Sequence, residues 1–232
     1  MAAAGSDLPG WVMPFSALYR ADLNRVADAL QIGRDDLFID LGCGSGGTGI
    51  WIAERTGASL VGVDFSAVAT ENATELAQRR GISKRADFVT ADATQTGLST
   101  GIADAVACIE VVMFSDASRV LAEISRLLKP AGRAVVIAAE AITDDAPPIV
   151  ARDYRPLFAD NALEIMTYDA LIHYRERVLS LYHAIYDRAE ALRTQMGVGA
   201  DYLVGEAQKW LAREHLPPRT RDIFIVARRA SS

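Results

Sequence analysis

Short apolar runs alternate with amphipathic segments over the first 140 residues of the chain. Each run has the continuous apolar character of a strand that is buried on both faces. Because predicted helices separate the strands, right-handed crossovers are expected, and the pattern predicts a parallel, doubly wound α/β sheet. The predicted strands are Leu37–Leu41, Leu60–Val63, Phe88–Thr90, Ala105–Ile109 and Ala134–Ala138, and the predicted helices between them are Thr48–Arg55, Ala67–Arg80 and Ala117–Leu128.

Further elements are predicted on both sides of this alternating block. Apolar residues at helical spacing predict a helix over Pro14–Leu30, which ends before Gly33. Lys129–Gly132 predicts a turn that stops the last helix of the block and leads into the next strand. The elements predicted after Glu140 are a strand over Leu163–Thr167, a long amphipathic helix over Leu171–Met196, a helix near Tyr202–Arg213 and a last strand over Ile223–Ala227.

Composition narrows the class of protein. A chain of 232 residues that is half apolar can bury one substantial core. The net charge of −6 argues against a nucleic-acid backbone as the main partner, because such a partner needs clustered Lys and Arg. Cys43 and Cys108 are too few for a disulfide framework and lie in no metal-binding pattern. Without a long apolar stretch or an export signal in Met1–Asp7, we expect a cytoplasmic protein that needs no membrane and no metal.

The residues with the most chemical content run from Phe38 to Gly47, where a strand enters a glycine-rich turn and then a helix. Such a turn lets a nucleotide-like ligand approach the backbone and exposes the amides of the helix N-terminus. Gly42, Gly44 and Gly47 also satisfy the fingerprint of dinucleotide-binding proteins, so the loop alone leaves NAD open. Asp64, at the end of the second strand, is placed to accept hydrogen bonds from ribose hydroxyls in either case.

The charge around the loop distinguishes the two cofactors. Arg55 is the only basic side chain between Asp36 and Gln78, which leaves little positive charge for a diphosphate. Ligands of such sheets bind at the carboxyl ends of the strands, and an acidic site there favours a cofactor with sulfonium and amino cations, S-adenosylmethionine. Each acid taken alone could instead be a helix cap or a solvated loop residue. The acids at or near the strand ends are Asp40, Asp64, Asp92, Glu110 and Glu140.

Four motifs resemble successive motifs of the class I S-adenosylmethionine-dependent methyltransferases and occur in that family's order over about residues 35–140. They are Asp40–Gly46, Gly62–Ser66, Ala91–Ala93 and Leu128–Arg133. The resemblance implies that Asp40 helps to hold the methionine portion of S-adenosylmethionine, that Asp64 binds its ribose, and that Phe65 and Asp92 hold its adenine. The cofactor-binding residues that the resemblance implies are Asp40, Gly42, Cys43, Gly44, Asp64, Phe65, Asp92, Ala93, Ile109 and Glu110. For the Cys43 thiol itself we expect packing rather than reactivity.

The same resemblance implies a Rossmann-like seven-stranded sheet of order 3-2-1-4-5-7-6 with the last strand antiparallel. Residues 170–216 then form a helical lid between the last two strands, and with the N-terminal helix they would roof the active site and exclude water. The chain is therefore expected to consist of an N-terminal helical cap (1–34), a cofactor-binding core (35–140) and a C-terminal part with the lid (141–232), within one structural domain.

Two residues are candidate catalysts. Methyl transfer from a sulfonium is an in-line displacement, so a base matters only where the acceptor must lose a proton. Glu110 is the leading polar candidate beside the transferred methyl, with a cap or loop contact as the alternative. His183 is the second, because Asp187 lies one helical turn later and could orient the imidazole; the alternative is an ordinary surface pair. Relatives that methylate hydroxyls can carry His after the fourth strand, where this chain has Val111–Phe114.

The predicted function is methyl transfer from S-adenosylmethionine to O, N or C of a small organic acceptor, possibly in secondary metabolism, by a monomer or homodimer. Two alternatives stay open: a methyltransferase fold that carries out a cyclisation or rearrangement, and a cofactor-binding protein without catalysis. The acceptor pocket is the least recognisable part, and its tyrosines could equally be core packing. The candidate acceptor-binding residues are Trp11, Met113, Glu140, Tyr174, Tyr182 and Tyr186.

Overall fold

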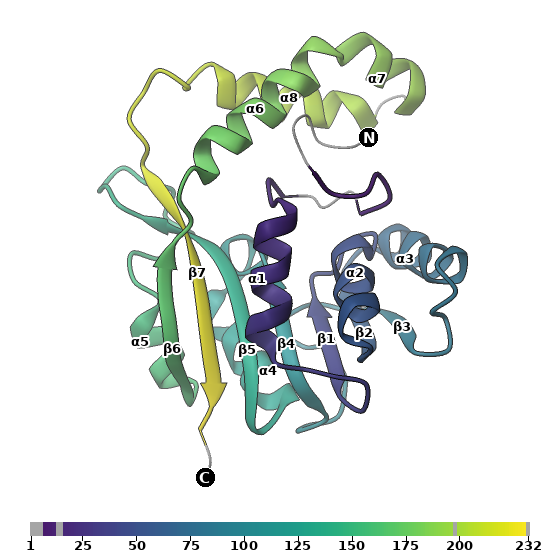
Figure 1. Cartoon of the computed structure of the whole chain (residues 1–232). Coiled ribbons are helices and arrows are strands. Elements are labelled where there is room, and N and C mark those ends of the chain that lie inside the picture. Colours follow the sequence, from purple (N-terminus) through teal and green to yellow (C-terminus); the bar gives the residue numbers. More distant parts are fainter. Residues whose placement is uncertain (1–6, 13–15, 197–198, 231–232) are drawn as a thin grey trace.

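One seven-stranded sheet forms the centre of the computed structural model, which describes residues 7–12, 16–196 and 199–230 (Figure 1). The strand order is β3-β2-β1-β4-β5-β7-β6, and β7 runs antiparallel to both of its neighbours. This confirms the predicted order and the antiparallel last strand. The strands are β1 (Leu37–Leu41), β2 (Ser59–Asp64), β3 (Ala86–Thr90), β4 (Ala103–Ile109), β5 (Leu128–Ala141), β6 (Leu163–Ala170) and β7 (Thr220–Arg229).

Helices cover both faces of the sheet, as the alternating pattern predicts. One face packs against α1 (Arg20–Leu30), α2 (Gly47–Thr56) and α3 (Ala67–Arg79), and the other against α4 (Ala117–Leu127) and α5 (Arg155–Asp160). In β1, Phe38 belongs to the first of these core clusters and Ile39 to the second. Successive side chains of a strand point to opposite faces, which is why the central strands are apolar without interruption.

The N-terminal helix is shorter than predicted, and it lies elsewhere. Helix α1 begins at Arg20 because the Tyr19 amide donates a hydrogen bond to Asp22 Oδ2 (2.8 Å) and fixes the first turn there. The predicted start at Pro14 lies outside the described residues. Contrary to the expected roof, α1 packs along the sheet beside β4 and β5 through buried residues such as Leu23 and Val26 (Figure 1).

The residues before α1 take the place over the site that the helix was expected to fill. We call the described residues 7–12 and 16–19 the N-terminal strap. Val12 is fully buried, and its backbone lies so close to Gly47 that a Cβ at Gly47 would be 2.8 Å from the Val12 carbonyl oxygen. The strap therefore covers the first turn of α2, directly after the glycine-rich loop.

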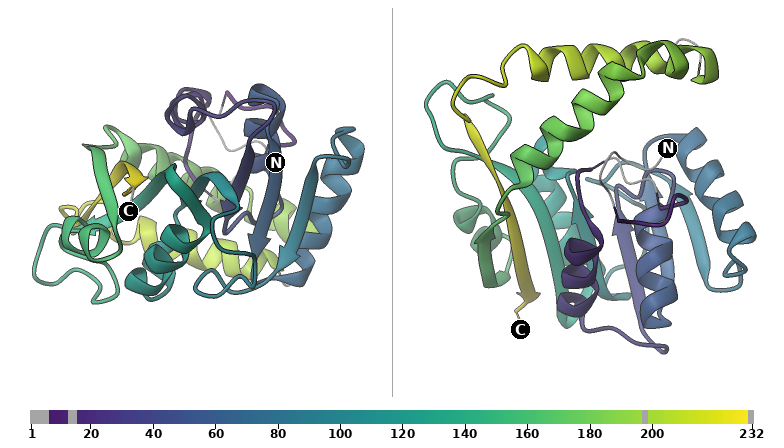
Figure 2. Two further views of the ribbon diagram at one scale, coloured as in Figure 1. Left: turned by 90° about the horizontal axis from the view of Figure 1, so that it is seen from below. Right: turned by 45° about the horizontal axis from the view of Figure 1, so that its top comes forward.

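The segment expected to form the lid, residues 170–216, contains three helices among its described residues, where the sequence predicts two; we call this segment the lid. The predicted helix over Leu171–Met196 is divided into α6 (Tyr174–Asp187) and α7 (Ala189–Met196), and α8 (Gly199–Leu211) follows. The chain turns at Arg188, which lets Leu192 pack with Ile185 of α6 and Val204 of α8 in a small core of the lid's own. That packing, which periodicity along one helix cannot reveal, is the physical reason for the break. The lid stands over the carboxyl ends of the parallel strands (Figure 2).

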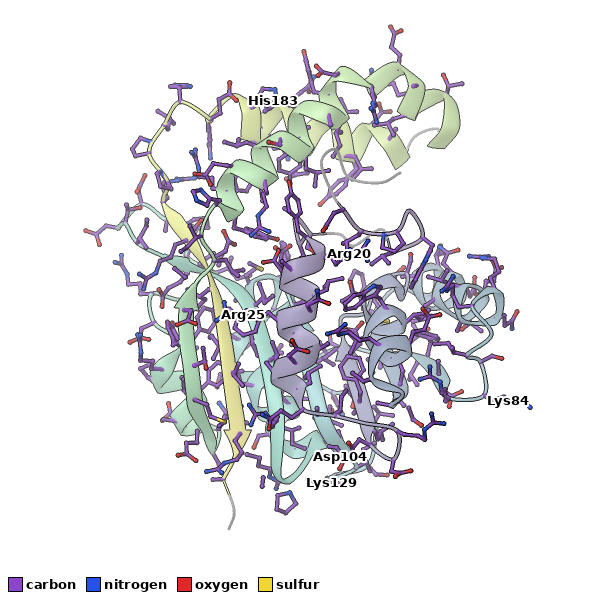
Figure 3. All side chains as sticks on the ribbon, viewed as in Figure 1. Arg20, Arg25, Lys84, Asp104, Lys129 and His183 are labelled. Atoms are coloured by element: carbon purple, nitrogen blue, oxygen red, sulfur yellow. The ribbon has the colours of Figure 1, made fainter. Side chains whose placement is uncertain are left out.

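Two other differences concern element ends. Lys129–Gly132 is the first part of β5 rather than a separate turn, with Ala131 at a φ of 63°. Helix α5 and the short 3-10 helix η1 (Val112–Phe114) are additional to the predicted elements. At the end of the sheet opposite the lid, Lys129 Nζ donates a hydrogen bond to Asp104 (2.7 Å), which joins β5 to β4 (Figure 3).

Candidate functional site

The glycine-rich loop joins β1 to α2 and uses left-handed backbone at three positions. Gly42, Gly44 and Gly46 have φ angles of 81°, 52° and 79°, a region that side chains with a Cβ rarely adopt. A Cβ at Gly42 would collide with the Val111 side chain, and one at Gly46 would be 2.7 Å from the Cβ of Ala73. A Cβ at Gly44, by contrast, would meet no atom within 4 Å. Gly44 therefore borders open space that a ligand can use.

Asp64 holds this loop in place from the end of β2. Its Oδ2 accepts a hydrogen bond from the Gly44 amide (2.9 Å), and its Oδ1 accepts one from the Ser66 amide (3.0 Å) at the start of α3. A carboxylate has about four lone-pair sites, so both oxygens can accept further hydrogen bonds from a diol. The predicted ribose-binding residue is thus already fixed by the backbone on both sides.

Asp40, on β1, lies beneath the loop and is buried. No hydrogen bond of normal geometry reaches its Oδ2 within the described part of the chain, although Gly49 of α2 packs against this oxygen, where a Cβ would be 2.6 Å away, and the Gly49 amide interacts weakly with the carboxylate. Burial raises the pKa of Asp40 to about 7; the amide of Gly49 works against the shift, and the charge of Asp64 adds to it. A buried carboxylate oxygen without a partner is costly unless a ligand supplies a donor, and an ammonium group is the donor that suits it.

An apolar surface lies beside these acids. The Phe65 ring, directly after β2, is 82% exposed, and Val68 in the first turn of α3 is 66% exposed. After β3, Asp92 Oδ1 accepts hydrogen bonds from the hydroxyl and the amide of Thr94 (both 2.7 Å), which hold the pKa of Asp92 below its usual value. The neighbouring Ala93 is half-buried. An exposed aromatic ring with a carboxylate nearby suits a flat heteroaromatic base.

Cys43 fits the packing role that we expect for it. Its side chain is buried, and a Cβ at Gly62 would be 2.9 Å from its Sγ. Burial, followed by the charges of Asp40 and Asp64, raises the pKa of the Cys43 thiol far above its ordinary value. The thiol is therefore neutral and unreactive at physiological pH.

Glu110 follows Ile109, the last residue of β4, in a left-handed conformation with a φ of 57°. Its amide donates a hydrogen bond to the Ile137 carbonyl oxygen (2.7 Å), and its Oε1 accepts one from the Tyr174 hydroxyl of the lid. Burial raises the pKa of Glu110 to about 8, and the negative charge of Asp222 adds to the shift. A carboxyl group that is neutral at pH 7, beside the loop, is a feature of functional sites.

Asp222 belongs to the same site, although the sequence analysis does not include it. It lies near the start of β7 and pairs in register with Ala139 of β5. Burial raises the pKa of Asp222 to about 6, against which the positive charge of Arg177 works. The signal in the sequence is a lone acid before a wholly apolar strand, but only the antiparallel pairing of β7 brings it near Glu110.

The tyrosines predicted to bind the acceptor occupy different environments. Tyr174 is buried and contacts Glu110 as described. Tyr182 stacks on Trp210 of α8, with ring centroids 5.6 Å apart, and Tyr186 is 48% exposed. Met113 is half-buried on η1. Tyr174 therefore lies at the site, whereas the contact of Tyr182 favours lid packing; the acceptor role of each stays a prediction.

Other candidates have protein partners that favour structural roles. Glu140 is buried, accepts a hydrogen bond from Arg221 Nε (2.7 Å) and contacts the Tyr168 hydroxyl. The Arg80 guanidinium carbon, at the end of α3, lies 4.2 Å from the centroid of the Trp11 ring. Their acceptor roles stay predictions without support from these contacts.

His183 does not pair with Asp187 as the helical spacing predicts. Its Nε2 lies 2.7 Å from Glu214 Oε2, because the chain after α8 comes back beside α6. The His183 side chain is 52% exposed and sits on the lid (Figure 3). This exposed surface pair does not reach Glu110, so the favoured catalytic candidate of the two is Glu110.

The sheet order, the open glycine loop and three carboxylates, those of Asp40 in β1, Asp64 at the end of β2 and Asp92 after β3, suit a nucleoside cofactor on a class I methyltransferase fold. A model of the methyltransferase domain family matches residues 39–136. Residues 39–136 are therefore similar to the methyltransferase domain family. Within the described ranges, no helix has the length and apolarity for crossing a membrane, and no three His, Cys, Asp or Glu residues could jointly hold a metal ion.

Known proteins resemble the chain in sequence and in fold. "Methyltransferase GfsG" of Streptomyces halstedii is 27% identical over 71% of this chain and 60% of its own length, and with other curated relatives the match spans 25% to 35% of their length. The chain thus spans less than two thirds of these relatives. The crystal structure of the [4+2]-cyclase SpnF has a TM-score of 0.80 at 19% identity, covering 91% of this chain and 81% of that one. A geranyl diphosphate methyltransferase in complex with SAM has a TM-score of 0.71 at 22% identity, covering 99% and 94%. At these identities the two structures establish the fold.

Proposed function

We propose that the protein transfers a methyl group from S-adenosylmethionine to a small organic acceptor held under the lid. The observation that carries the proposal is the unpartnered, buried oxygen of Asp40 beneath a glycine loop that is open at Gly44 and held by Asp64. S-adenosylmethionine has an ammonium group, a ribose diol and, between them, a part that must lie close to the loop backbone. Asp40 suits the ammonium group, the open loop at Gly44 suits the part between, and Asp64 suits the diol.

Each residue of the site would hold one part of S-adenosylmethionine. When bound, S-adenosylmethionine supplies a methyl group on a sulfonium that is open to in-line attack. Asp40 would accept hydrogen bonds from the ammonium of its methionine part, and Asp64 from the ribose hydroxyls. Phe65 would stack on the adenine, and Asp92 would accept a hydrogen bond from the adenine amino group. Glu110 would border the methyl group and the acceptor.

The charges at this end of the site favour a neutral or cationic acceptor. Glu110 and Asp222 are acidic, and Arg177 of α6 is already paired with Asp22 of α1. Both side chains of that pair are 14% exposed, so an anionic acceptor would have to break a largely buried ion pair to use the guanidinium. We therefore infer that the methyl group goes to a hydroxyl, an amine or a nucleophilic carbon of an acceptor that is not a phosphate ester.

Calorimetric titration with S-adenosylmethionine and, separately, NAD tests the cofactor. We expect micromolar binding of S-adenosylmethionine and none of NAD. Asp64→Ala should weaken binding roughly 100-fold, as expected when two hydrogen bonds to a charged group are lost at about 1.5 kcal/mol each. Asp87→Ala, on the exposed edge strand β3, is the matched control and should bind normally. NAD binding alone, or equal effects of the two variants, would contradict the proposal.

A panel of compounds that carry a hydroxyl group, an amine or a nucleophilic carbon then tests the reaction through release of S-adenosylhomocysteine. The alternative of a cyclisation or rearrangement is kept because the [4+2]-cyclase SpnF has this fold, although 19% identity carries the fold alone. Conversion of a compound without S-adenosylhomocysteine would favour that alternative. Tight cofactor binding without turnover of any compound would favour a binding protein.

A further inference from the structure

Resting on the proposed function, we propose that Glu110 is a charge-gated base. Its carboxyl group holds a proton while no cation lies in the methionine end of the pocket, and gives it up when a sulfonium is held there. The carboxylate is then ready to take a proton from the acceptor only when a methyl donor is present.

The backbone fixes Glu110 beside the glycine loop. The next residue, Val111, lies so close to Gly42 that a Cβ there would collide with it. The hydrogen bond from the Glu110 amide to Ile137 holds the left-handed turn at the carboxyl end of β4. The methionine end of a ligand held by the loop would therefore lie next to the Glu110 side chain.

Three segments enclose the Glu110 carboxyl group. The Tyr174 hydroxyl donates a hydrogen bond to its Oε1 from the lid and accepts one from the Ala17 amide of the N-terminal strap (3.0 Å). Tyr174 itself is 3% exposed. The strand end, the lid and the strap thus leave the half-buried Glu110 carboxyl group with restricted access to water, so a charge on Glu110 is poorly solvated.

The charged and titratable groups that act on Glu110 from neighbouring elements are mainly acidic. Asp222 of β7 raises its pKa, and Tyr182 of α6 is close enough for its own pKa to be raised by Glu110. Arg177 of α6, whose positive charge acts on Asp222, is paired with Asp22. With a pKa of about 8, Glu110 is mostly protonated at pH 7. A unit positive charge at about 4–6 Å lowers a carboxyl pKa by about 1–3 units, enough to reverse this state.

The reaction then balances without another reactant. The nucleophilic atom of the acceptor forms a bond to the methyl carbon, the bond between that carbon and sulfur breaks, and its electron pair stays on sulfur. The hydrogen on the nucleophile leaves as a proton to the Glu110 carboxylate. After transfer the sulfur is neutral, so Glu110 retains this proton. A protonated Glu110 cannot act as a base again until another sulfonium is bound.

Proton release on ligand binding tests the gating without any acceptor. Calorimetry at pH 7 in buffers of different ionisation enthalpy counts the protons released by S-adenosylmethionine and by S-adenosylhomocysteine, which has the same ammonium but a neutral sulfur. Protons lost by Asp40 are common to both ligands. If the sulfonium lowers the Glu110 pKa by about 2, S-adenosylmethionine releases about 0.8 proton more.

Variants assign that difference to a residue. Glu110→Gln should abolish it, measured at ligand concentrations that saturate the variant. Tyr174→Phe removes a donor to the ionised form and should reduce it, whereas Tyr186→Phe, on the exposed part of the same helix, should leave it unchanged. An infrared difference spectrum of the unmodified protein should lose a protonated carboxyl band when S-adenosylmethionine binds.

Equal proton release by the two ligands would overturn the inference, as would a difference that persists in Glu110→Gln and disappears in Asp222→Asn. Either result leaves the proposed function intact, since both ligands have bound. Failure of S-adenosylmethionine to bind would instead contradict the proposed function itself.

Discussion

Gly44→Ala separates cofactor binding from folding more sharply than any acidic residue of the site. Gly44 has a φ of 52°, and a Cβ there would meet no protein atom within 4 Å. The cost to the fold is therefore left-handed strain alone, about 1–2 kcal/mol. In a domain of this size, 1 kcal/mol lowers Tm by about 2–4 °C, so we expect a Tm about 2–8 °C below that of the unmodified protein.

Gly81→Ala is the matched control for this strain. Gly81 follows α3 at the opposite end of the sheet, with a φ of 70° and open space around its Cβ position. Its Tm should fall by the same amount. The two variants should differ in ligand binding. The added methyl group at Gly44 occupies the space that S-adenosylmethionine would use, whereas the one at Gly81 faces solvent.

Thermal unfolding with and without S-adenosylmethionine is the assay. A ligand at 100 times its Kd stabilises the folded state by about 2.7 kcal/mol, which raises Tm by about 5–11 °C. The unmodified protein and Gly81→Ala should show this rise, and Gly44→Ala should show none. A full ligand-induced rise in Gly44→Ala, or its loss in Gly81→Ala, would refute the assignment of the open space to the cofactor.

Three further predictions concern other parts of the molecule. Burial by itself would raise the pKa of Glu123, but hydrogen bonds from Arg126 hold this pKa below its usual value. Glu123→Gln should therefore cost about 2–3 kcal/mol in calorimetric unfolding at pH 7, and the difference from the unmodified protein should shrink as pH falls below about 4, where the native carboxylate becomes protonated. Phe65→Ala should weaken S-adenosylmethionine binding roughly 10-fold by calorimetry and leave Tm unchanged, because the ring is 82% exposed; a lower Tm without a weaker affinity would contradict the stacking role. Arg177→Met breaks the ion pair with Asp22 that joins α6 to α1, so amide hydrogen exchange should accelerate in the lid and not in the sheet; uniform acceleration would show that the pair stabilises the whole domain.

The sequence by itself determined the sheet and its cofactor loop. Hydrophobic periodicity is a local property, and strands buried on both faces are continuous apolar runs wherever they lie in the chain. The glycines between Asp40 and Gly47 were equally visible, since left-handed turns require residues without a Cβ. The strand order itself came from the resemblance of the motifs to the class I methyltransferases, while the alternation of elements indicated only a parallel, doubly wound sheet.

Tertiary structure alone decided how the acceptor end is assembled. Asp222, Tyr174 and Ala17 are far apart in sequence, and they meet around Glu110 only through the antiparallel pairing of β7, the folding of the lid and the path of the N-terminal strap. Spacing along one helix likewise suggested Asp187 as the partner of His183, whereas the return of the chain after α8 supplies Glu214. Periodicity identifies which face of an element is apolar, but long-range packing determines which side chains meet there, and with them the protonation state of the site.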